Sequence, residues 1–216
     1  AHGIQAIGSD VTIKEAGYVT ITANAGETGS ASAIYAKGGE NKANVTIENS
    51  GTVKLIANGN ENDAVLHADT NSNVNIKGKV EITDTNGKVA VKVAEGSTVK
   101  IGGGKIKGDI QIGEVAGTYN LRSRIMMLAT GDKPTGEFTF DGSDDTWEGD
   151  YTGADDASLI LALNNGATWT GAKESNGNLD LTIETNGTWK NTSDNATTVT
   201  TLSGKGGFVE MSEGDL

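Results

Sequence analysis

The 216-residue chain contains no cysteine, a single proline and few aromatic residues, which make up 5% of the sequence. Without cysteine it forms no disulfide and offers no thiolate for metal binding or nucleophilic attack. It also lacks a run of about 18 apolar residues, and its first residues do not follow the pattern of a secretory signal. We therefore expect no direct membrane insertion by this segment and a fold held by its core.

Basic residues are also scarce, with 17 Lys and Arg against 29 Asp and Glu, so the net charge is −12. Such a charge repels the phosphates of nucleic acids, and we expect no nucleic-acid partner. What is abundant is glycine, with 31 residues, together with many Thr, Asn and Val residues. This composition is typical of short strands joined by tight turns.

A Thr-Trp dipeptide occurs three times toward the C-terminus. Its tryptophans, Trp147, Trp169 and Trp189, are 22 and then 20 residues apart. A fixed period near 20 residues is typical of stacked units that cannot bury an apolar face alone. We therefore predict that the three tryptophans are stacked core neighbours.

The leucine-rich segments between the tryptophans repeat at the same 20-residue offset, so that Leu161 aligns with Leu181 and Leu163 with Ile183. Apolar residues alternate with others in each segment, which predicts a strand with one buried face. Each repeat is interpreted as one coil of a solenoid, with these four residues in its core.

The first half of the chain carries a longer repeat. Each unit has two apolar-polar-apolar triplets joined by a short turn, such as 11–13 and 19–21, with 80–82 and 106–108 as later second triplets. A third, small-residue strand precedes each pair, and its alanines recur at Ala6, Ala36, Ala68 and Ala94. Two registers one residue apart stay open for this strand, because aligning Ala94 with Ala68 places Lys92 at the position of Leu66.

Three strands per unit close a triangular coil. We predict an all-β fold, a right-handed parallel β-helix (β-solenoid) with three short strands per coil and roughly eight coils, on the order of 40 Å long. Residues 1–118 would form the coils with longer repeats of 26–32 residues, and 138–216 the tryptophan-bearing coils with repeats of 20–22 residues. Residues 119–137 break the pattern as an irregular insertion or loop.

The insertion is either a core strand flanked by a long turn or a protruding loop that binds a ligand. Its apolar and basic run supplies four candidate ligand-binding residues, Arg122, Arg124, Met126 and Met127. An acidic cluster supplies four more, Asp141, Asp144, Asp145 and Asp150. The acidic residues are either solvated turns flanking Trp147 or a calcium site, although their spacing fits no EF-hand or nonapeptide repeat.

Signals for catalysis are weak in this sequence. The two histidines are His2 and His67, and no Gly-x-Ser-x-Gly elbow surrounds a serine. Clustered carboxylates leave a polysaccharide-acting β-helix enzyme open as an alternative. We predict no catalytic residues, no metal and no cofactor.

The phrases at 165–171 and 186–189, followed by residues 206–211, resemble the passenger domains of pertactin-like monomeric autotransporters. The resemblance covers about the last 80 residues, while the first half is similar only to a looser β-helical adhesin pattern. In that family the tryptophan-bearing coils are structural and carry no active site. The chain is therefore expected to begin and end within a longer solenoid.

The resemblance implies a passenger on the surface of, or secreted from, a Gram-negative type of cell, anchored by an outer-membrane translocator barrel lying beyond this chain. The expected function is that of an adhesin in attachment, aggregation or biofilm growth. Its partner would be a host or bacterial surface protein or glycan, with self-association also open. The rival from another class is a purely structural stalk that displays a binding region elsewhere.

Overall fold

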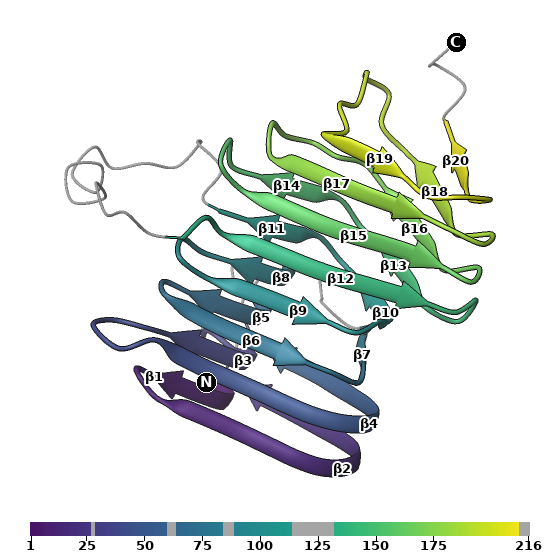
Figure 1. Cartoon of the computed structure of the whole chain (residues 1–216). Coiled ribbons are helices and arrows are strands. Elements are labelled where there is room, and N and C mark those ends of the chain that lie inside the picture. The colour runs from purple at the N-terminus through teal and green to yellow at the C-terminus, as the bar shows by residue number, and fades with distance from the viewer. Residues whose placement is uncertain (27–28, 60–63, 84–88, 114–131, 212–216) are drawn as a thin grey trace.

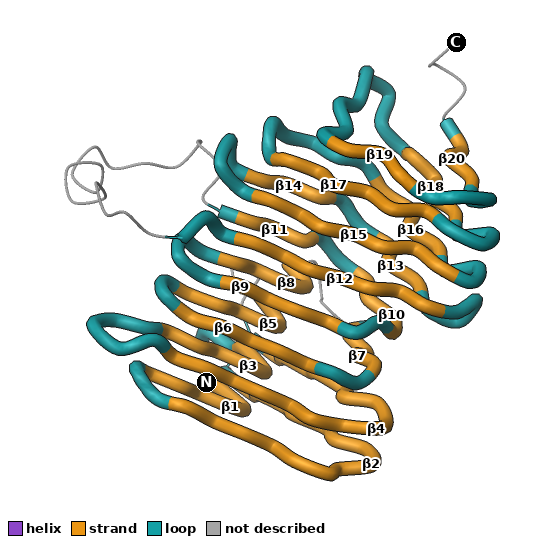
Figure 2. Tube along the Cα trace, viewed as in Figure 1, coloured by secondary structure: helices purple, strands orange, loops and turns teal. Residues whose placement is uncertain are grey.

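The computed structural model describes residues 1–26, 29–59, 64–83, 89–113 and 132–211. Within these ranges the chain forms strands and connecting turns with no helix (Figure 2), so none that is long and apolar enough to cross a membrane. The strands stack coil upon coil from one end of the molecule to the other (Figure 1). The fold is a right-handed parallel β-helix, as the sequence predicted.

One side of the coils, called face A, is a 6-stranded parallel sheet whose order follows the chain. Its strands are β1 (His2–Ile7), β3 (Ser32–Lys37), β5 (Ala64–Asp69), β8 (Val89–Val93), β11 (Ile110–Ile112) and β14 (Tyr151–Gly153). Each strand pairs in parallel with the equivalent strand of the next coil. Face A therefore ends at β14, although two further coils follow.

The other two sides, faces B and C, belong to one 14-stranded sheet that bends at a corner of each coil. Face B contains the first parts of β2 (Asp10–Asn24) and β4 (Ala43–Asn58), then β6 (Ser72–Ile76), β9 (Thr98–Ile101), β12 (Thr135–Asp141), β15 (Ser158–Asn164), β17 (Asn178–Ile183) and β19 (Thr201–Ser203). Face C contains the second parts of β2 and β4, then β7 (Lys79–Ile82), β10 (Gly104–Lys107), β13 (Thr146–Glu148), β16 (Thr168–Gly171), β18 (Thr188–Asn191) and β20 (Phe208–Glu210). Eight stacked segments on each of these faces match the predicted number of coils.

The strands β2 and β4 depart from the prediction of two short strands joined by a turn. Each runs continuously from face B to face C, with shifts of register between Lys14 and Tyr18. The corner is tight, because a Cβ atom on Gly51 would lie 1.5 Å from the carbonyl oxygen of Gly17. Glycine thus lets β4 bend around the corner while it stays paired with β2.

The inward residues of face B form continuous apolar columns, as predicted. One column aligns Val11, Val45, Val74 and Val99, and the next aligns Ile13, Ile47, Ile76 and Ile101. Farther along, Leu161 pairs with Leu181 and Leu163 with Ile183, and all four are buried. The predicted core positions of the leucine repeats are therefore confirmed.

The tryptophans form one inward column on face C. Trp147 pairs with Trp169 and Trp169 with Trp189, with ring centroids 4.6 and 4.8 Å apart and planes inclined by 3° and 5°. Each indole N–H donates to a glycine carbonyl of the preceding coil at 3.0–3.1 Å. The predicted tryptophan stack is confirmed, and it continues a column of smaller residues that ends at Ile106.

The alanine column of face A corrects one predicted alignment. Ala6, Ala36 and Ala68 are partners, but the next coil contributes Val93 rather than Ala94. Lys92 consequently pairs with His67 on the outer side, not with Leu66 in the core. The register that buries Val91 and Val93 is the one adopted, because it keeps the charged Lys92 outside.

A second correction concerns the strand β10. Ile106 pairs with Ile82, so residues 104–106 align with 80–82 and the predicted alignment of 106–108 is wrong by two residues. Gly104 takes the place opposite Val80, where a Cβ atom would lie 2.0 Å from the Val80 carbonyl oxygen. The glycine run at 102–104 hides the alternation from which the register was predicted.

Most of the predicted insertion lies outside the described residues, which resume at Asp132. Its last three residues, 135–137, belong to β12, which pairs with β9 and β15 as an ordinary strand of face B. Exposed apolar side chains are found on the last coil, at Leu202, Phe208 and Val209.

Candidate functional site

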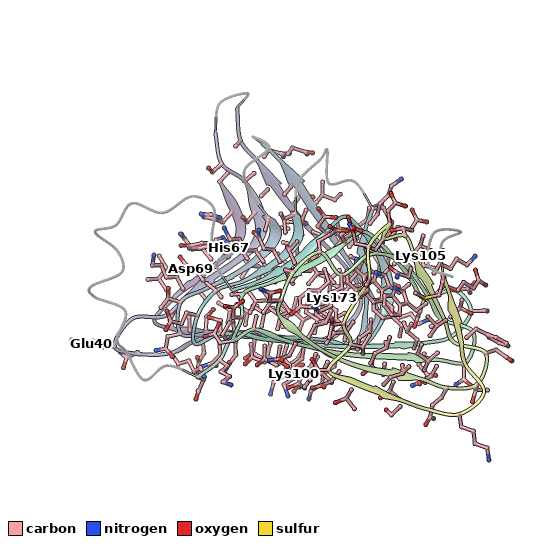
Figure 3. All side chains as sticks on the ribbon, turned by 90° about the horizontal axis from the view of Figure 1, so that it is seen from above. Glu40, His67, Asp69, Lys100, Lys105 and Lys173 are labelled. Atoms are coloured by element: carbon pink, nitrogen blue, oxygen red, sulfur yellow. The ribbon has the colours of Figure 1, made fainter. Side chains whose placement is uncertain are left out.

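The two histidines lie on the outer side of face A, together with Tyr35. The ring of His2 stacks on Tyr35 with centroids 4.6 Å apart, and His67 contacts the same tyrosine edge-on at 5.3 Å. Figure 3 places His67 beside Asp69 at the outside of the coils. The three rings therefore form an aromatic stripe across three stacked strands.

Asp69 is the most strongly perturbed carboxyl beside this stripe. It accepts hydrogen bonds from the Tyr35 hydroxyl and the Thr70 amide, each at 2.7 Å, and Lys37 Nζ lies 3.0 Å away. Burial alone would raise its pKa, but these bonds and the Lys37 charge outweigh burial and hold the pKa of Asp69 well below its usual range. The Asp69 carboxylate thus links β3 to β5, which is a structural role.

The pKa of Tyr35 responds to the same contacts. It is raised from its ordinary value, first by burial and then by the hydrogen bond that its hydroxyl donates to Asp69. A tyrosine with a raised pKa stays protonated at neutral pH, so it keeps this bond rather than acting as a base.

The acidic turn beside Trp147 has a buried member. Asp145 is 1% exposed and accepts hydrogen bonds from Lys79 Nζ at 2.6 Å and from the backbone N–H of Asp141 at 2.9 Å. The hydrogen bond to Asp145 raises the pKa of Lys79. This pair ties the turn before β13 to β7, two coils away along face C.

The other candidate carboxylates do not converge on one point. Asp141 and Asp144 are exposed, and Asp150 accepts the backbone N–H of Ala172 at 2.8 Å. Nowhere in the described ranges do three or more His, Cys, Asp or Glu side chains come together as a metal site requires. The acidic residues that are close together in the sequence therefore make separate contacts in the turns. The candidates Arg122, Arg124, Met126 and Met127 lie outside the described residues.

A groove of about 400 Å³ opens on the outer side of face B and is called the face B groove. It crosses β2, β4, β6, β9 and β12, and nine of its ten lining residues have polar or charged side chains. The lining residues are Asp10, Thr12, Asn44, Thr46, Asn73, Val74, Asn75, Thr98, Lys100 and Glu137.

Two outward columns build this groove. In the first, Asn44 Nδ2 donates to Asp10 Oδ1 at 2.7 Å, and Asn73 Nδ2 donates to Asn44 Oδ1 at 2.9 Å. Such a ladder holds the amide groups in one orientation from coil to coil. The groove wall is therefore ordered before any ligand arrives.

The second column aligns Thr12, Thr46, Asn75, Lys100 and Glu137. At one end Lys100 and Glu137 form an ion pair at 2.6 Å, and Figure 3 places Lys100 at the edge of the coils. The first column exposes a carboxylate at Asp10, and the second ends on this pair. Between them lie hydroxyl and amide groups that can both donate and accept hydrogen bonds.

The sequence contained a signal for the groove that the prediction did not use. The middle residue of each first triplet is outward by alternation, and Thr12, Thr46, Asn75 and Lys100 occupy that position in four successive units. Aligning the triplets for their apolar residues also aligns these polar ones. They form a polar stripe across stacked strands.

Comparison with protein-family models, with curated proteins and with solved structures found no match for this chain. The outer surfaces of the β-helix and their chemistry are therefore the basis for assigning a function.

Proposed function

We propose that this chain is a segment of an autotransporter passenger that acts as a non-enzymatic adhesin on a bacterial surface, and that its face B groove binds a glycan. The face B groove is the observation that carries the proposal. It offers about 400 Å³ of space along five stacked strands, lined by amides, hydroxyls and one ion pair. The β-helix and its tryptophan column add support, because they agree with the resemblance to pertactin-like passengers.

A glycan suits this groove for a physical reason. Outward groups repeat at about 4.8 Å from strand to strand, so five strands present a polar track of roughly 19 Å. A chain of hydroxyl-rich units meets donors and acceptors along that track, and each hydrogen bond contributes about 0.5–1.5 kcal/mol. Such contacts are weak singly, but many copies of a passenger on one cell surface bind together by multivalency.

The carboxylates of the groove favour binding over hydrolysis. Glycoside hydrolases place two carboxyl groups about 5–9.5 Å apart on either side of the scissile bond. Asp10 lies on β2 and Glu137 on β12, four strand spacings or about 19 Å away. Glu137 is also paired with Lys100 at 2.6 Å. This arrangement fits a binding groove.

The proposal is tested with the purified chain on immobilised neutral and acidic glycans, on epithelial cells and on neighbouring bacteria. The variant Thr12→Ala with Thr46→Ala removes two groove hydroxyls. The variant Thr146→Ala with Thr168→Ala removes two outward hydroxyls from adjacent strands of face C and serves as the matched control. Two lost hydrogen bonds weaken glycan binding about tenfold in the groove variant and leave the control unchanged.

Three results would contradict the proposal, each in a different way. Equal binding by both variants would move the adhesive site elsewhere on the chain. A lack of binding to every surface would favour the structural stalk. Release of reducing ends from a bound polysaccharide would favour an enzyme.

A further inference from the structure

A second groove, of about 440 Å³, lies at the C-terminal coils, beyond the end of face A. It is bounded by two loops, residues 173–178 after β16 and residues 193–200 after β18. Face A ends at β14, so these loops occupy the side of the coils that earlier coils cover with a strand. This space is called the terminal groove.

Lys173 stands at an unusual position beside this groove. It bridges in parallel to Tyr151, and Tyr151 continues the inward column of Leu66, Val91 and Ile110 on face A. A lysine therefore takes the register of a core residue. Figure 3, which views the coils from above, shows Lys173 within their outline, whereas Lys100 lies at the edge.

Among the residues that the structure describes, no carboxylate pairs with Lys173. Five other lysines have an acidic oxygen at 3.0 Å or closer, but in the described part of the chain no salt bridge within 4.0 Å reaches Lys173. Its Nζ donates to the Ser175 carbonyl oxygen. Burial lowers the pKa of Lys173 from its ordinary value, as expected for a cation that loses water without gaining an anion.

The rest of the groove lining is polar and small. It is formed mainly by Ser, Thr and Asn residues, with Asn176, Asn195, Thr197 and Thr198 among them, and Glu174 is exposed. These groups suit a ligand that carries several hydroxyls. No large apolar side chain lines the groove, so it offers no pocket for the side chains of a peptide.

We propose that the terminal groove binds an acidic sugar, with the carboxylate of a uronate unit paired to Lys173 and the ring hydroxyls facing the Asn and Thr side chains. The ammonium and carboxylate form a charge-assisted hydrogen bond, which the partly buried position strengthens. The net charge of −12 disfavours a densely charged polyanion, so the ligand carries isolated carboxylates among neutral sugars. This site is separate from the face B groove.

The test uses the whole chain, labelled with nitrogen-15, and follows its amide resonances while methyl glucuronide is added. We expect saturable shifts confined to residues 173–178 and 193–200, and no saturable shifts with methyl glucoside, which has the same ring without the carboxylate. Lys173→Met raises the Kd for the glucuronide at least about tenfold. Methionine suits the apolar column, and thermal melting confirms that the variant is folded.

Lys190→Met is the matched control, because Lys190 is exposed on β18 and its loss changes the net charge equally. It leaves the glucuronide affinity within about twofold of the parent. Absence of saturable shifts in the parent chain, or shifts that map elsewhere, would overturn the proposal whether or not the variants fold. Equal binding of acetate would show a carboxylate site without sugar recognition and would overturn the assignment to a sugar. Because the probes and residues differ from those of the face B groove, either site can fail alone.

Discussion

The tryptophan column makes the sharpest prediction about stability. Trp169 is fully buried and is the central member of the column, with a stacked indole on each side at 4.6 and 4.8 Å. Trp147 and Trp189 each have one stacked indole, because the column continues to Ile106 on one side and Val209 on the other. Trp169→Ala therefore removes two aromatic pairs, whereas Trp189→Ala removes one.

The expected loss follows from three contributions. Truncating a buried tryptophan to alanine costs about 3–5 kcal/mol, which includes the cavity. Each aromatic pair adds about 0.5–1.5 kcal/mol beyond area burial. The indole N–H of Trp169 also donates to the Gly149 carbonyl at 3.0 Å, and leaving that oxygen unpaired costs about 1 kcal/mol. Because these contributions overlap, we expect about 4–6 kcal/mol for Trp169→Ala and about 1 kcal/mol less for Trp189→Ala.

The assay is urea unfolding followed by circular dichroism, combined with amide hydrogen exchange. In a solenoid each coil contacts its neighbours only, so the loss is local. Exchange in Trp169→Ala should quicken in β15 to β18 and stay near the parent rate in β4 and β6. Trp169→Phe, which keeps a ring in the stack but loses the N–H, should cost about half as much as Trp169→Ala.

Two results would refute this reasoning. Equal losses for the central and the outer tryptophan would mean that stacking contributes nothing beyond buried area. Faster exchange spread evenly over all coils would mean that the β-helix unfolds as one cooperative unit.

Two further predictions concern the half-buried Asp69 and the buried Asp145, each of which pairs with a lysine. The folded pKa of Asp69 lies below its ordinary value of 3.8, so its contribution to stability is present above that value and is lost as the pH falls toward the folded pKa. Asp69→Asn should therefore lower the free energy of unfolding most at about pH 6 and less at about pH 2.5, where the unfolded carboxyl is largely protonated but the folded one stays ionised; an equal effect at both would contradict the shift. Asp145→Asn should lower the free energy of unfolding by about 2 kcal/mol. Lys79→Met should lower it more, because this variant leaves the buried Asp145 carboxylate without its cation. The reverse order in urea unfolding would contradict a stabilising ion pair between Lys79 and Asp145.

The strands that the sequence predicted best are those whose apolar residues alternate without interruption. Leu161 and Leu163 were placed opposite Leu181 and Ile183 because a constant 20-residue offset leaves one alignment that keeps both faces consistent. The three tryptophans followed for the same reason. In such segments a slip of one residue would expose a whole apolar column, so the pattern alone sets the register.

The strand at 89–93 shows where the pattern fails. Its sequence, Val-Ala-Val-Lys-Val, has apolar residues on both sides, so neither register is excluded within the strand itself. The next coil decides, because Ile110 and Ile112 flank Gln111 and pair with Val91 and Val93. The information was in the sequence, but it lay one coil away from the ambiguous strand.

The continuous bend of β2 and β4 depends on backbone geometry that side-chain patterns do not report. The contact of Gly51 with the Gly17 carbonyl exists only once the two coils are stacked. The candidate sites are subject to the same limit. Asp145 was grouped with its sequence neighbours, yet its partner Lys79 is 66 residues away.

Face A ends one coil after the tryptophan column begins, because Trp147 lies on β13 and the next strand, β14, is the last strand of face A. In the earlier coils three strands surround a core of valine, isoleucine and alanine. From Trp147 onward the coils shorten, β14 is the last strand of face A, and residues 193–199 form no strand. In the last two coils the pairing of face A is reduced to the bridge between Tyr151 and Lys173. The indole bonds from Trp147, Trp169 and Trp189 to glycine carbonyls meanwhile connect successive coils along face C. The loops of the terminal groove lie on the side where earlier coils have a strand of face A. Because these loops form no strand of face A, they leave space between them for a polar groove.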